Sequence, residues 1–163
     1  MSESWYDGAQ ICKNGHLVTE NFDSHPVHNE KFCSKCGAET ITKCMQCNAK
    51  IRGAYHVPGV CGFSEYAVPF YCYSCGSSYP WTEEKIKAIK DFSNEIDLNA
   101  EDKRIIEENV SSIVVDSPKT QVSAVRIKKV LTKLGGAFAE KLQDMIVDIA
   151  SETAVKLIKG KIQ

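Results

Sequence analysis

Apolar residues recur at helical spacing throughout the second half of the chain. The first group of positions three or four residues apart, as on one face of an α-helix, is Ile86, Ile89, Phe92 and Ile96. Three further groups follow, which are Ile105, Ile106, Val110 and Ile113, then Ala124, Ile127, Leu131 and Leu134, then Phe138, Leu142, Ile146, Ile149 and Leu157. We therefore predict four amphipathic helices, over about residues 83–96, 100–114, 118–134 and 137–159.

Polar residues mark the starts of these predicted helices. Thr82 and Asn99 are suitable N-caps, because their side-chain oxygens can accept hydrogen bonds from the free amides of a first turn. Trp81 and Ile86 flank Thr82 at the spacing of a hydrophobic staple. Ser117-Pro118 has the order of an N-cap followed by a first-turn proline, so it predicts the start of the third helix.

The first half of the chain has short apolar runs among cysteines, glycines and aromatic residues. Such runs predict turns and short β-hairpins rather than long elements. The composition changes at Tyr79–Thr82, so we predict one domain over residues 1–82 and a helical region over residues 83–163. The first domain cannot bury much apolar surface, and folds of that size normally need a disulfide or a metal ion.

Eight cysteines occur in the chain, and all of them precede residue 76. The N-terminal residues have no apolar signal core, and no stretch approaches the roughly 18 apolar residues of a membrane span. We therefore expect a cytoplasmic protein, in which thiols bind metal more often than they form disulfides. A disulfide framework is the alternative.

Three Cys-x-x-Cys pairs supply most of the ligands for two predicted zinc sites. Two of the pairs are followed by glycine, which is typical of a knuckle whose thiolates hold one ion across a tight turn. The segment Cys12–His16 offers a fourth pair of ligands, with Asn14-Gly15 at its turn. We predict one zinc ion on Cys12, His16, Cys33 and Cys36 and a second on Cys44, Cys47, Cys72 and Cys75. The predicted fold is a small metal-stabilised α+β protein, in which two consecutive zinc ribbons precede an α-helical half.

A different pairing would place four other cysteines on one ion, across a spacer of seven residues. That set is Cys33, Cys36, Cys44 and Cys47. It would leave Cys12 and His16 far along the chain from Cys72 and Cys75, so we favour the first pairing.

The remaining cysteine and histidines are not expected to bind metal. Cys61 is expected to be a small buried residue rather than a reactive nucleophile. His25 and His28 lie in a polar loop and are expected to be solvated. His56 is expected at a strand end, in a surface or packing role.

A series of motifs resembles a known bacterial family. In chain order they are Cys12–His16, Phe32–Ala38, Cys44–Cys47, Ile51–Gly53, Val57–Gly59, Tyr71–Gly76 and Tyr79–Glu83. Over about residues 9–90 this order is similar to an uncharacterised family, domain of unknown function 2321. The resemblance implies a zinc-ribbon character, and it implies no activity.

The ligand sets and motifs do not indicate an enzyme. A catalytic zinc keeps an open coordination position, whereas each predicted site has four good ligands. The sequence has no His-Glu-x-x-His motif and no P-loop, and Ser64 and Glu65 near Cys61 do not make a triad. We therefore expect no catalytic activity.

Charge is balanced in the chain as a whole and uneven along the helical half. The chain has 20 basic and 21 acidic residues, and residues 1–82 have 6 and 7. A helical hairpin folded at Gly135-Gly136 would place a basic stripe opposite an acidic one, in the pairs Lys133 with Glu140, Lys129 with Asp144, Arg126 with Asp148 and Lys119 with Glu152. Two separately solvated helix faces are an equally good interpretation.

These features lead to three hypotheses for function. The first is a non-catalytic zinc-binding adaptor whose ribbons present a surface to a protein partner and whose helices dock or self-associate. Its candidate contact residues lie in the loop 52–70 and are Arg52, Tyr55, His56, Phe63, Tyr66 and Phe70. The second is a nucleic-acid-binding ribbon, which the charge of residues 1–82 disfavours. The third is a helical membrane-acting effector with a ribbon sensor.

Overall fold

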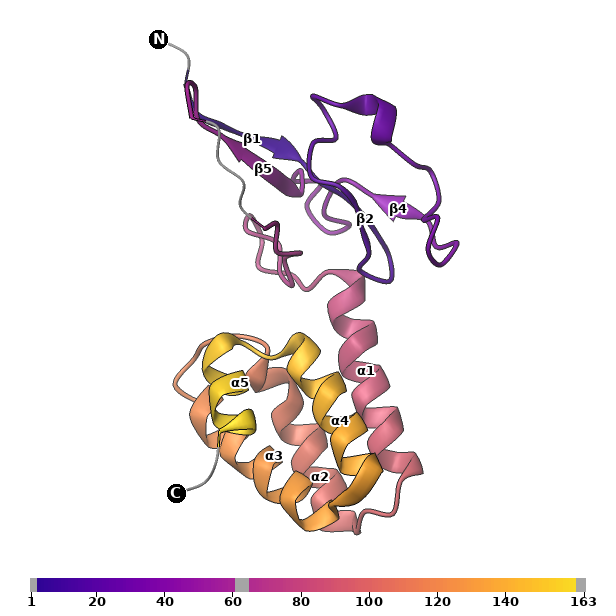
Figure 1. The fold of residues 1–163 in the computed structure, drawn as a ribbon, viewed down its shortest axis with the longest axis vertical. Helices are drawn as coiled ribbons and strands as arrows, with labels where there is room; N and C mark the ends of the chain where they lie inside the picture. The colour runs from indigo at the N-terminus through magenta and orange to yellow at the C-terminus, as the bar shows by residue number, and fades with distance from the viewer. Residues whose placement is uncertain (1–2, 61–64, 161–163) are drawn as a thin grey trace. The chain divides into compact units, whose positions relative to one another are not determined.

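The computed structural model describes residues 3–60 and 65–160 and divides the chain into two compact units, Met1–Glu83 and Glu84–Gln163. The described strands all belong to the first unit, and nearly all of the α-helical residues belong to the second (Figure 1). The sequence places this division after Thr82, one residue earlier. The protein is therefore a small α+β protein with its sheets and helices in separate parts of the chain.

The first unit contains two small antiparallel sheets. Strand β1 (Trp5–Gly8) pairs with β5 (Arg52–His56), and Trp5 lies opposite His56. In the other sheet, β2 (Gln10–Cys12) is the central strand between β3 (Leu17–Thr19) and β4 (Thr40–Ile41). A single 3₁₀ turn, η1 (Pro26–His28), lies between β3 and β4 along the chain.

The strands of the first unit are interleaved along the chain. Strand β5 lies between Cys47 and Cys72, yet it pairs with residues that precede Cys12. Gly53 allows this close approach, because a Cβ atom there would lie 2.1 Å from the carbonyl oxygen of Glu20. The short β-hairpins predicted from the sequence did not anticipate this pairing between distant segments.

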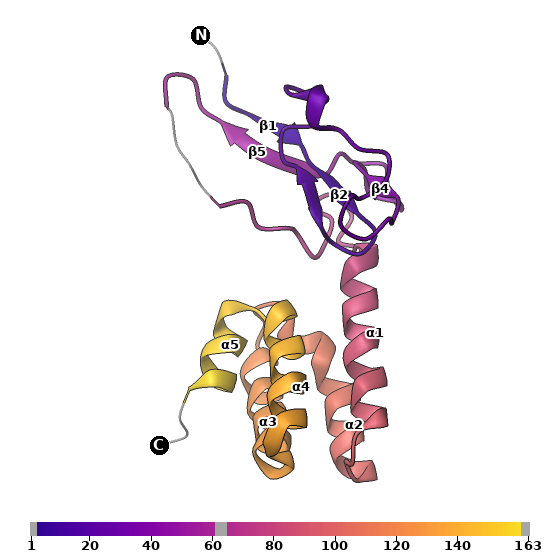
Figure 2. The same cartoon turned by 45° about the vertical axis from the view of Figure 1, so that its right-hand side comes forward.

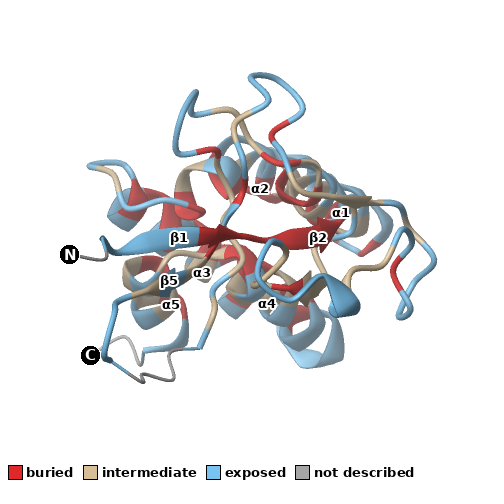
Figure 3. Cartoon of the chain, turned by 90° about the horizontal axis from the view of Figure 1, so that it is seen from above, coloured by how far each residue is buried: buried red, intermediate tan, exposed pale blue. Residues whose placement is uncertain are grey.

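The core of the first unit lies where the strands meet the start of the first helix. Its buried residues are Ala9, Ile11, Cys44, Ile51, Cys72, Tyr79 and Trp81. The rings of Tyr79 and Trp81 are stacked with their centroids 4.6 Å apart, and the indole Nε1 donates to the carbonyl oxygen of Pro69 at 2.8 Å. Figure 3 shows that β2 is buried along its length, whereas β1 is exposed at its N-terminal end.

Five α-helices and one further 3₁₀ helix follow in the described part of the chain. They are α1 (Pro80–Glu95), α2 (Ala100–Asn109), η2 (Val110–Ile113), α3 (Thr120–Leu134), α4 (Gly136–Ile149) and α5 (Glu152–Lys159). Helix α3 contacts α2, η2, α4 and α5, so it is the centre of the helical unit (Figure 2). None of the described helices is long and apolar enough to cross a membrane.

The structure corrects one predicted helix start and confirms another. Helix α1 begins at Pro80, a residue suited to the first helical position, and not after Thr82. The Thr82 hydroxyl donates to the carbonyl oxygen of Phe70 at 2.6 Å, so it ties the helix to the preceding segment. Asn99 caps α2 as predicted, because its side chain accepts from the amide of Asp102.

The last two predicted helices also differ from those observed. Helix α3 begins at Thr120 rather than Pro118, and the Thr120 hydroxyl accepts from the amide of Ser117 at 2.8 Å. The helix predicted over 137–159 is two helices, because Ala150 is extended and Ser151 caps α5 by accepting from the amide of Ala154. The amide of Ser151 donates to the carbonyl oxygen of Ile113, which holds the break in place.

The residues of the predicted apolar faces are buried or partly buried, apart from one exposed residue. Buried members include Ile89, Ile106, Ile127 and Leu142, each at most 1 % exposed. Phe138 was expected on the buried face of the last helix, but its side chain is 60 % exposed. It lies in the first turn of α4, where its ring is 6.5 Å from that of Phe92.

The ion pairs predicted across the helical hairpin are wrong. Among the described residues, none of the four pairs is formed. Lys133 lies 2.7 Å from Asp102 on α2, and Asp148 lies 2.7 Å from Lys85 on α1. Glu152 pairs within α5, with Lys156. The predicted pairing is not formed for two reasons. The helix break at Ala150–Ser151 displaces Glu152, and charged residues on other helices lie closer to Lys133 and Asp148.

Candidate metal centres

The three Cys-x-x-Cys pairs form the same backbone turn. In each, the amide of the first cysteine donates to the carbonyl oxygen five residues later, at 2.8 Å. The carbonyl oxygen of that cysteine accepts from the amide four residues later, at 2.7–2.9 Å. The residue at this last position has a positive φ angle in all three turns, namely Gly37 at 72°, Asn48 at 60° and Gly76 at 74°. Asparagine therefore takes the place of glycine in the middle turn, as its tolerance of left-handed backbone permits.

The segment Cys12–His16 makes a fourth turn of related geometry. The amide of Gly15 donates to the carbonyl oxygen of Cys12 at 2.8 Å, and that of Cys12 donates to the carbonyl oxygen of His16 at 3.0 Å. Gly15 has a φ angle of 87°, and a Cβ atom there would lie 2.9 Å from Cβ of Trp81. Both the backbone conformation and the contact with Trp81 therefore require glycine.

These four turns bring the eight predicted ligands into two groups of four. The first group is Cys12, His16, Cys33 and Cys36, and the second is Cys44, Cys47, Cys72 and Cys75. Within each group the candidate ligand atoms all lie within 4.8 Å of one another. The alternative pairing is not formed, because the pairs Cys33/Cys36 and Cys44/Cys47 belong to different groups.

The distances within each group match the edges of a tetrahedron around zinc. Zinc–sulfur bonds of about 2.3 Å imply sulfur–sulfur edges of about 3.8 Å, and a sulfur–nitrogen edge is slightly shorter. In the first group Cys12 Sγ lies 3.7 Å from Cys36 Sγ and 3.5 Å from His16 Nδ1. In the second group the distances Cys44 Sγ to Cys75 Sγ and Cys47 Sγ to Cys72 Sγ are both 3.7 Å. The donor atoms therefore fit a single tetrahedral ion in each group.

Hydrogen bonds directed at sulfur favour the thiolate form that binds metal. The amide of Ala38 donates to Cys36 and lowers the pKa of that thiol to about 6. The hydroxyl and amide of Ser77 lower the pKa of Cys75 to about 6 in the same way. Amide groups of Gln46 and Ser74 also lie 3.4 Å from Sγ of the first cysteine in their turns. Other ligands of the same groups are shifted the opposite way: burial raises the pKa of Cys12, and, although the amide of Ala49 acts against it, burial and the neighbouring thiols raise the pKa of Cys47 to about 11. Each group therefore contains one thiol that ionises readily beside one that holds its proton.

The other histidines lie outside both groups. His25 and His28 are exposed at the turn η1. His56 lies at the end of β5, where its ring stacks on that of Trp5 with centroids 4.9 Å apart. The expectation for Cys61 concerns a residue outside the described part of the chain.

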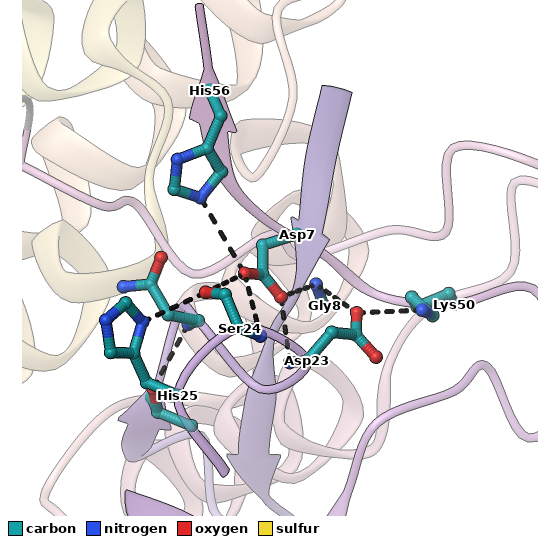
Figure 4. Close-up of polar contacts among 9 residues, drawn as sticks. Asp7, Gly8, Asp23, Ser24, His25, Lys50 and His56 are labelled. Carbon is teal, nitrogen blue, oxygen red and sulfur yellow. Dashed lines mark hydrogen bonds and ion pairs between the residues drawn. The ribbon is translucent and has the colours of Figure 1, made fainter. Parts of the chain in front are cut away.

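A buried carboxylate that no sequence motif marks organises the loop beside β1. Asp7 is 2 % exposed and accepts from the amides of Gly8, Asp23 and Ser24 and from the Ser24 hydroxyl (Figure 4). Burial by itself raises the pKa of Asp7, but these hydrogen bonds outweigh it and hold the pKa below its usual value of 3.8. The carboxylate is thus ionised and fixes the loop to the strand.

The order of the groups around Asp7 indicates a structural role. The Ser24 hydroxyl lies between Asp7 and His25, with His25 Nδ1 at 2.9 Å (Figure 4). In a nucleophilic triad the histidine lies between the carboxylate and the serine. Here the serine proton is engaged by Asp7, and His56 Nε2 points toward the same carboxylate at 3.7 Å.

All six tyrosines of the chain line one cavity in the first unit. We call this cavity the tyrosine pocket; its tyrosines are Tyr6, Tyr55, Tyr66, Tyr71, Tyr73 and Tyr79, and its charged residues are Glu20, Arg52 and Glu65. Its volume is about 330 Å³. Burial, and then the charge of Glu20, raise the pKa of Tyr66 to about 12, so its hydroxyl remains a donor and bonds to the carbonyl oxygen of Arg52 at 2.6 Å.

The fold and the two groups define a small α+β protein with paired clusters of metal-ligating side chains. The chain matches, over residues 5–158, the family described as "Uncharacterized protein conserved in bacteria (DUF2321)", and it belongs to that family. The match extends well beyond residues 9–90, so it includes the helical unit. No curated protein and no solved structure matches the chain.

Proposed function

We propose that the protein is a non-catalytic adaptor whose N-terminal unit is held together by two zinc ions. The observation that carries the proposal is the geometry of the two groups, each with four sulfur or nitrogen donors at tetrahedral spacing. Four protein ligands fill the coordination shell of zinc and leave no position for a substrate, as in structural sites. Such ligands remain reduced in a compartment like the cytoplasm.

The tyrosine pocket supplies the surface for a partner. Tyr6, Tyr55 and Tyr73 are each about half exposed, at 48 %, 56 % and 56 %. Tyrosine is enriched at protein interfaces because it offers a large apolar ring with a polar end. The predicted contact residues Arg52, Tyr55 and Tyr66 line this pocket, and Phe63 lies outside the described residues.

Metal analysis of the purified full-length protein tests the first half of this proposal. We expect two zinc ions per chain when the protein is purified without chelator. One ion or fewer per chain would contradict the two-site assignment. Iron in the second group, which has four cysteines, would contradict the choice of zinc.

A binding comparison tests the second half. The variant Tyr55→Ala/Tyr73→Ala should lose a protein partner that wild-type protein retains at physiological salt, whereas the matched variant Phe32→Ala, at an exposed aromatic residue outside the pocket, should keep it. Reconstitution with the purified partner should show the same difference. Equal retention by both variants would show that the partner does not use the tyrosine pocket.

Nucleic-acid binding is the second candidate, because exposed tyrosines can stack on bases. Residues 1–82 have more acidic than basic side chains, which disfavours a polyanion. Submicromolar binding to RNA or DNA at physiological salt, lost in Tyr55→Ala/Tyr73→Ala, would replace the adaptor proposal with this one.

Self-association through the helical unit is a further part of the proposal. Val122 and Val125 are exposed on α3, at 52 % and 40 %, and Phe138 is exposed on α4. Light scattering after size exclusion measures the assembly state directly. A monomer at every concentration tested would exclude this role for the helices.

A further inference from the structure

Arg52 is held against two tyrosine rings of the pocket. Its guanidinium carbon lies 3.8 Å from the ring centroid of Tyr73 and 4.6 Å from that of Tyr6, and it lies over both rings. Cation–π contacts of this length hold the guanidinium over the two rings and leave its N–H groups free to donate to an acceptor elsewhere.

These N–H groups have no acceptor within the described residues. Over residues 3–60 and 65–160 the guanidinium of Arg52 makes no ion pair and no hydrogen bond. Arg104, by contrast, pairs with both Glu101 and Glu108. A guanidinium that is held in place and unpaired is well suited to two parallel bonds with a carboxylate or a phosphate.

The charges around Arg52 limit the kind of anion that fits. Glu20 and Glu65 line the same pocket, so its charged lining residues are two negative side chains and one positive one. These carboxylates repel a polyanion such as RNA more strongly than a ligand whose single negative charge is paired with Arg52. The tyrosines then offer apolar ring surface beside that charge.

The backbone around the pocket is already engaged. The amide of Ala54 donates to the carbonyl oxygen of Glu20, and the carbonyl oxygen of Arg52 accepts from Tyr66. A ligand is therefore recognised by side chains rather than by addition of a strand to β5. With a volume of about 330 Å³, the pocket is at the small end of ligand clefts and takes a short segment rather than a folded surface.

We propose that the tyrosine pocket binds a peptide segment of a protein partner in which an Asp or Glu side chain pairs with Arg52 and a neighbouring apolar or aromatic side chain packs on the tyrosines. This inference rests on the proposed adaptor function and names the chemistry of the partner. The carboxylate belongs to a side chain within the segment and not to a chain terminus.

Selection of displayed random dodecapeptides on zinc-loaded full-length protein tests the inference. The peptides are fused at both ends, so no free terminal carboxylate is present. We expect a consensus with one Asp or Glu beside an aromatic or aliphatic residue. Synthetic peptides with amidated C-termini should then bind, and replacing their acidic residue with Asn or Gln should weaken binding about tenfold or more.

Protein variants locate the contact. Arg52→Gln should weaken binding of the selected peptide as much as loss of its carboxylate does, with no further loss when both changes are combined. Arg52→Lys should restore only part of the affinity, because an ammonium cannot make the paired contact. The control is Arg104→Gln, which removes the same charge from an exposed position on α2 and should leave binding unchanged. Each variant must retain the zinc content of wild-type protein.

The possible outcomes separate this inference from the proposed function. A consensus without an acidic residue, lost in Tyr55→Ala/Tyr73→Ala, would overturn the role of Arg52 and leave the adaptor function standing. Acidic peptides that bind Arg52→Gln as well as wild type would also overturn it. No selected peptide above background would overturn the peptide inference, and the adaptor function would then be decided by the partner-retention comparison of Tyr55→Ala/Tyr73→Ala with Phe32→Ala.

Discussion

Single residues control the metal groups through hydrogen bonds to sulfur and through left-handed turn positions. The three Cys-x-x-Cys turns share their hydrogen bonds but differ in the residue five positions after the first cysteine, which is Ala38, Ala49 or Ser77. Only the serine adds a side-chain hydroxyl, which lies 3.4 Å from Cys75 Sγ, where its oxygen accepts from the thiol. Once Cys75 is a thiolate it carries no proton, so the Ser77 hydroxyl is then the donor. Because alanine occupies this position in the other two turns, the backbone tolerates alanine there.

Ser77→Ala tests the contribution of this hydroxyl to metal affinity. The hydroxyl stabilises the Cys75 thiolate and helps to lower the pKa to about 6, so its removal raises that pKa. Protons then compete with zinc more effectively, and affinity at pH 6 should fall about two- to tenfold, with a smaller loss at pH 8. Competition with a chromophoric chelator measures the effect.

Ser74→Ala is the matched control in the same turn. Ser74 approaches Cys72 through its backbone amide, which the substitution retains. The zinc affinity of Ser74→Ala should therefore equal that of the wild-type protein at both pH 6 and pH 8. A pH-independent loss in Ser77→Ala would show that the hydroxyl acts on the fold of the turn and not on protonation of Cys75.

Cys44→Ala tests the second metal group directly. Cys44 is 2 % exposed and belongs both to the group of four cysteines and to the buried core. Its loss leaves three ligands, so we expect one zinc ion per chain by elemental analysis and a lower melting temperature for the N-terminal unit. Cys61→Ala should keep both ions and lose only about 1 kcal/mol of unfolding free energy. Loss of an ion in Cys61→Ala would refute the ligand assignment.

At the scale of elements, the short strands and the last helix depend on contacts from distant parts of the chain. Helix α5 has only eight residues, and a helix of that length is marginal by itself. Lys128 on α3 donates from Nζ to the carbonyl oxygens of Leu157, at 3.0 Å, and of Gly160. A positive side chain at this position satisfies free carbonyl groups and favours the negative end of the helix dipole.

Lys128→Met should therefore loosen α5 without unfolding the helical unit. We expect the backbone amides of α5 to exchange hydrogen severalfold faster in Lys128→Met than in the wild-type protein, which corresponds to a loss of about 1 kcal/mol of local stability. Lys129→Met is the control, because the neighbouring Lys129 is exposed and makes no described polar contact. Equal exchange of α5 in the two variants would show that packing alone holds the helix.

At the scale of the whole molecule, the two units differ in what stabilises them. The first has strands of two to five residues and a small core that includes two of the cysteines. The second buries apolar side chains from all of its helices, among them Ile89, Ile106, Ile127 and Ile146. Metal removal should therefore affect the units unequally.

A strong chelator should unfold the first unit and leave the second helical. We expect NMR signals of residues 5–79 to lose dispersion, whereas the helical circular dichroism signal at 222 nm should largely persist. Readdition of zinc should restore the dispersed signals. Loss of helical signal in step with zinc would show that the two units fold as one.

Local patterns in the sequence determined the ligand turns, the approximate positions of the first three helices and the cap at Asn99. These features depend on residues at most five positions apart, such as a Cys-x-x-Cys-Gly turn or an apolar face repeating every three or four residues. The spacing of the eight ligands also favours two sets of four, because only one pairing leaves no ligand far from a partner.

Only the tertiary structure decided the interleaved strands, the ion-pair register and the tyrosine pocket. Strand β5 pairs with β1 across more than forty residues, and Asp102 rather than Glu140 receives Lys133. The six tyrosines are scattered from Tyr6 to Tyr79 and meet around Arg52 only after the chain has folded. Pairing over such distances is chosen by the combined burial and hydrogen bonding of the whole unit, and no local run of residues specifies it.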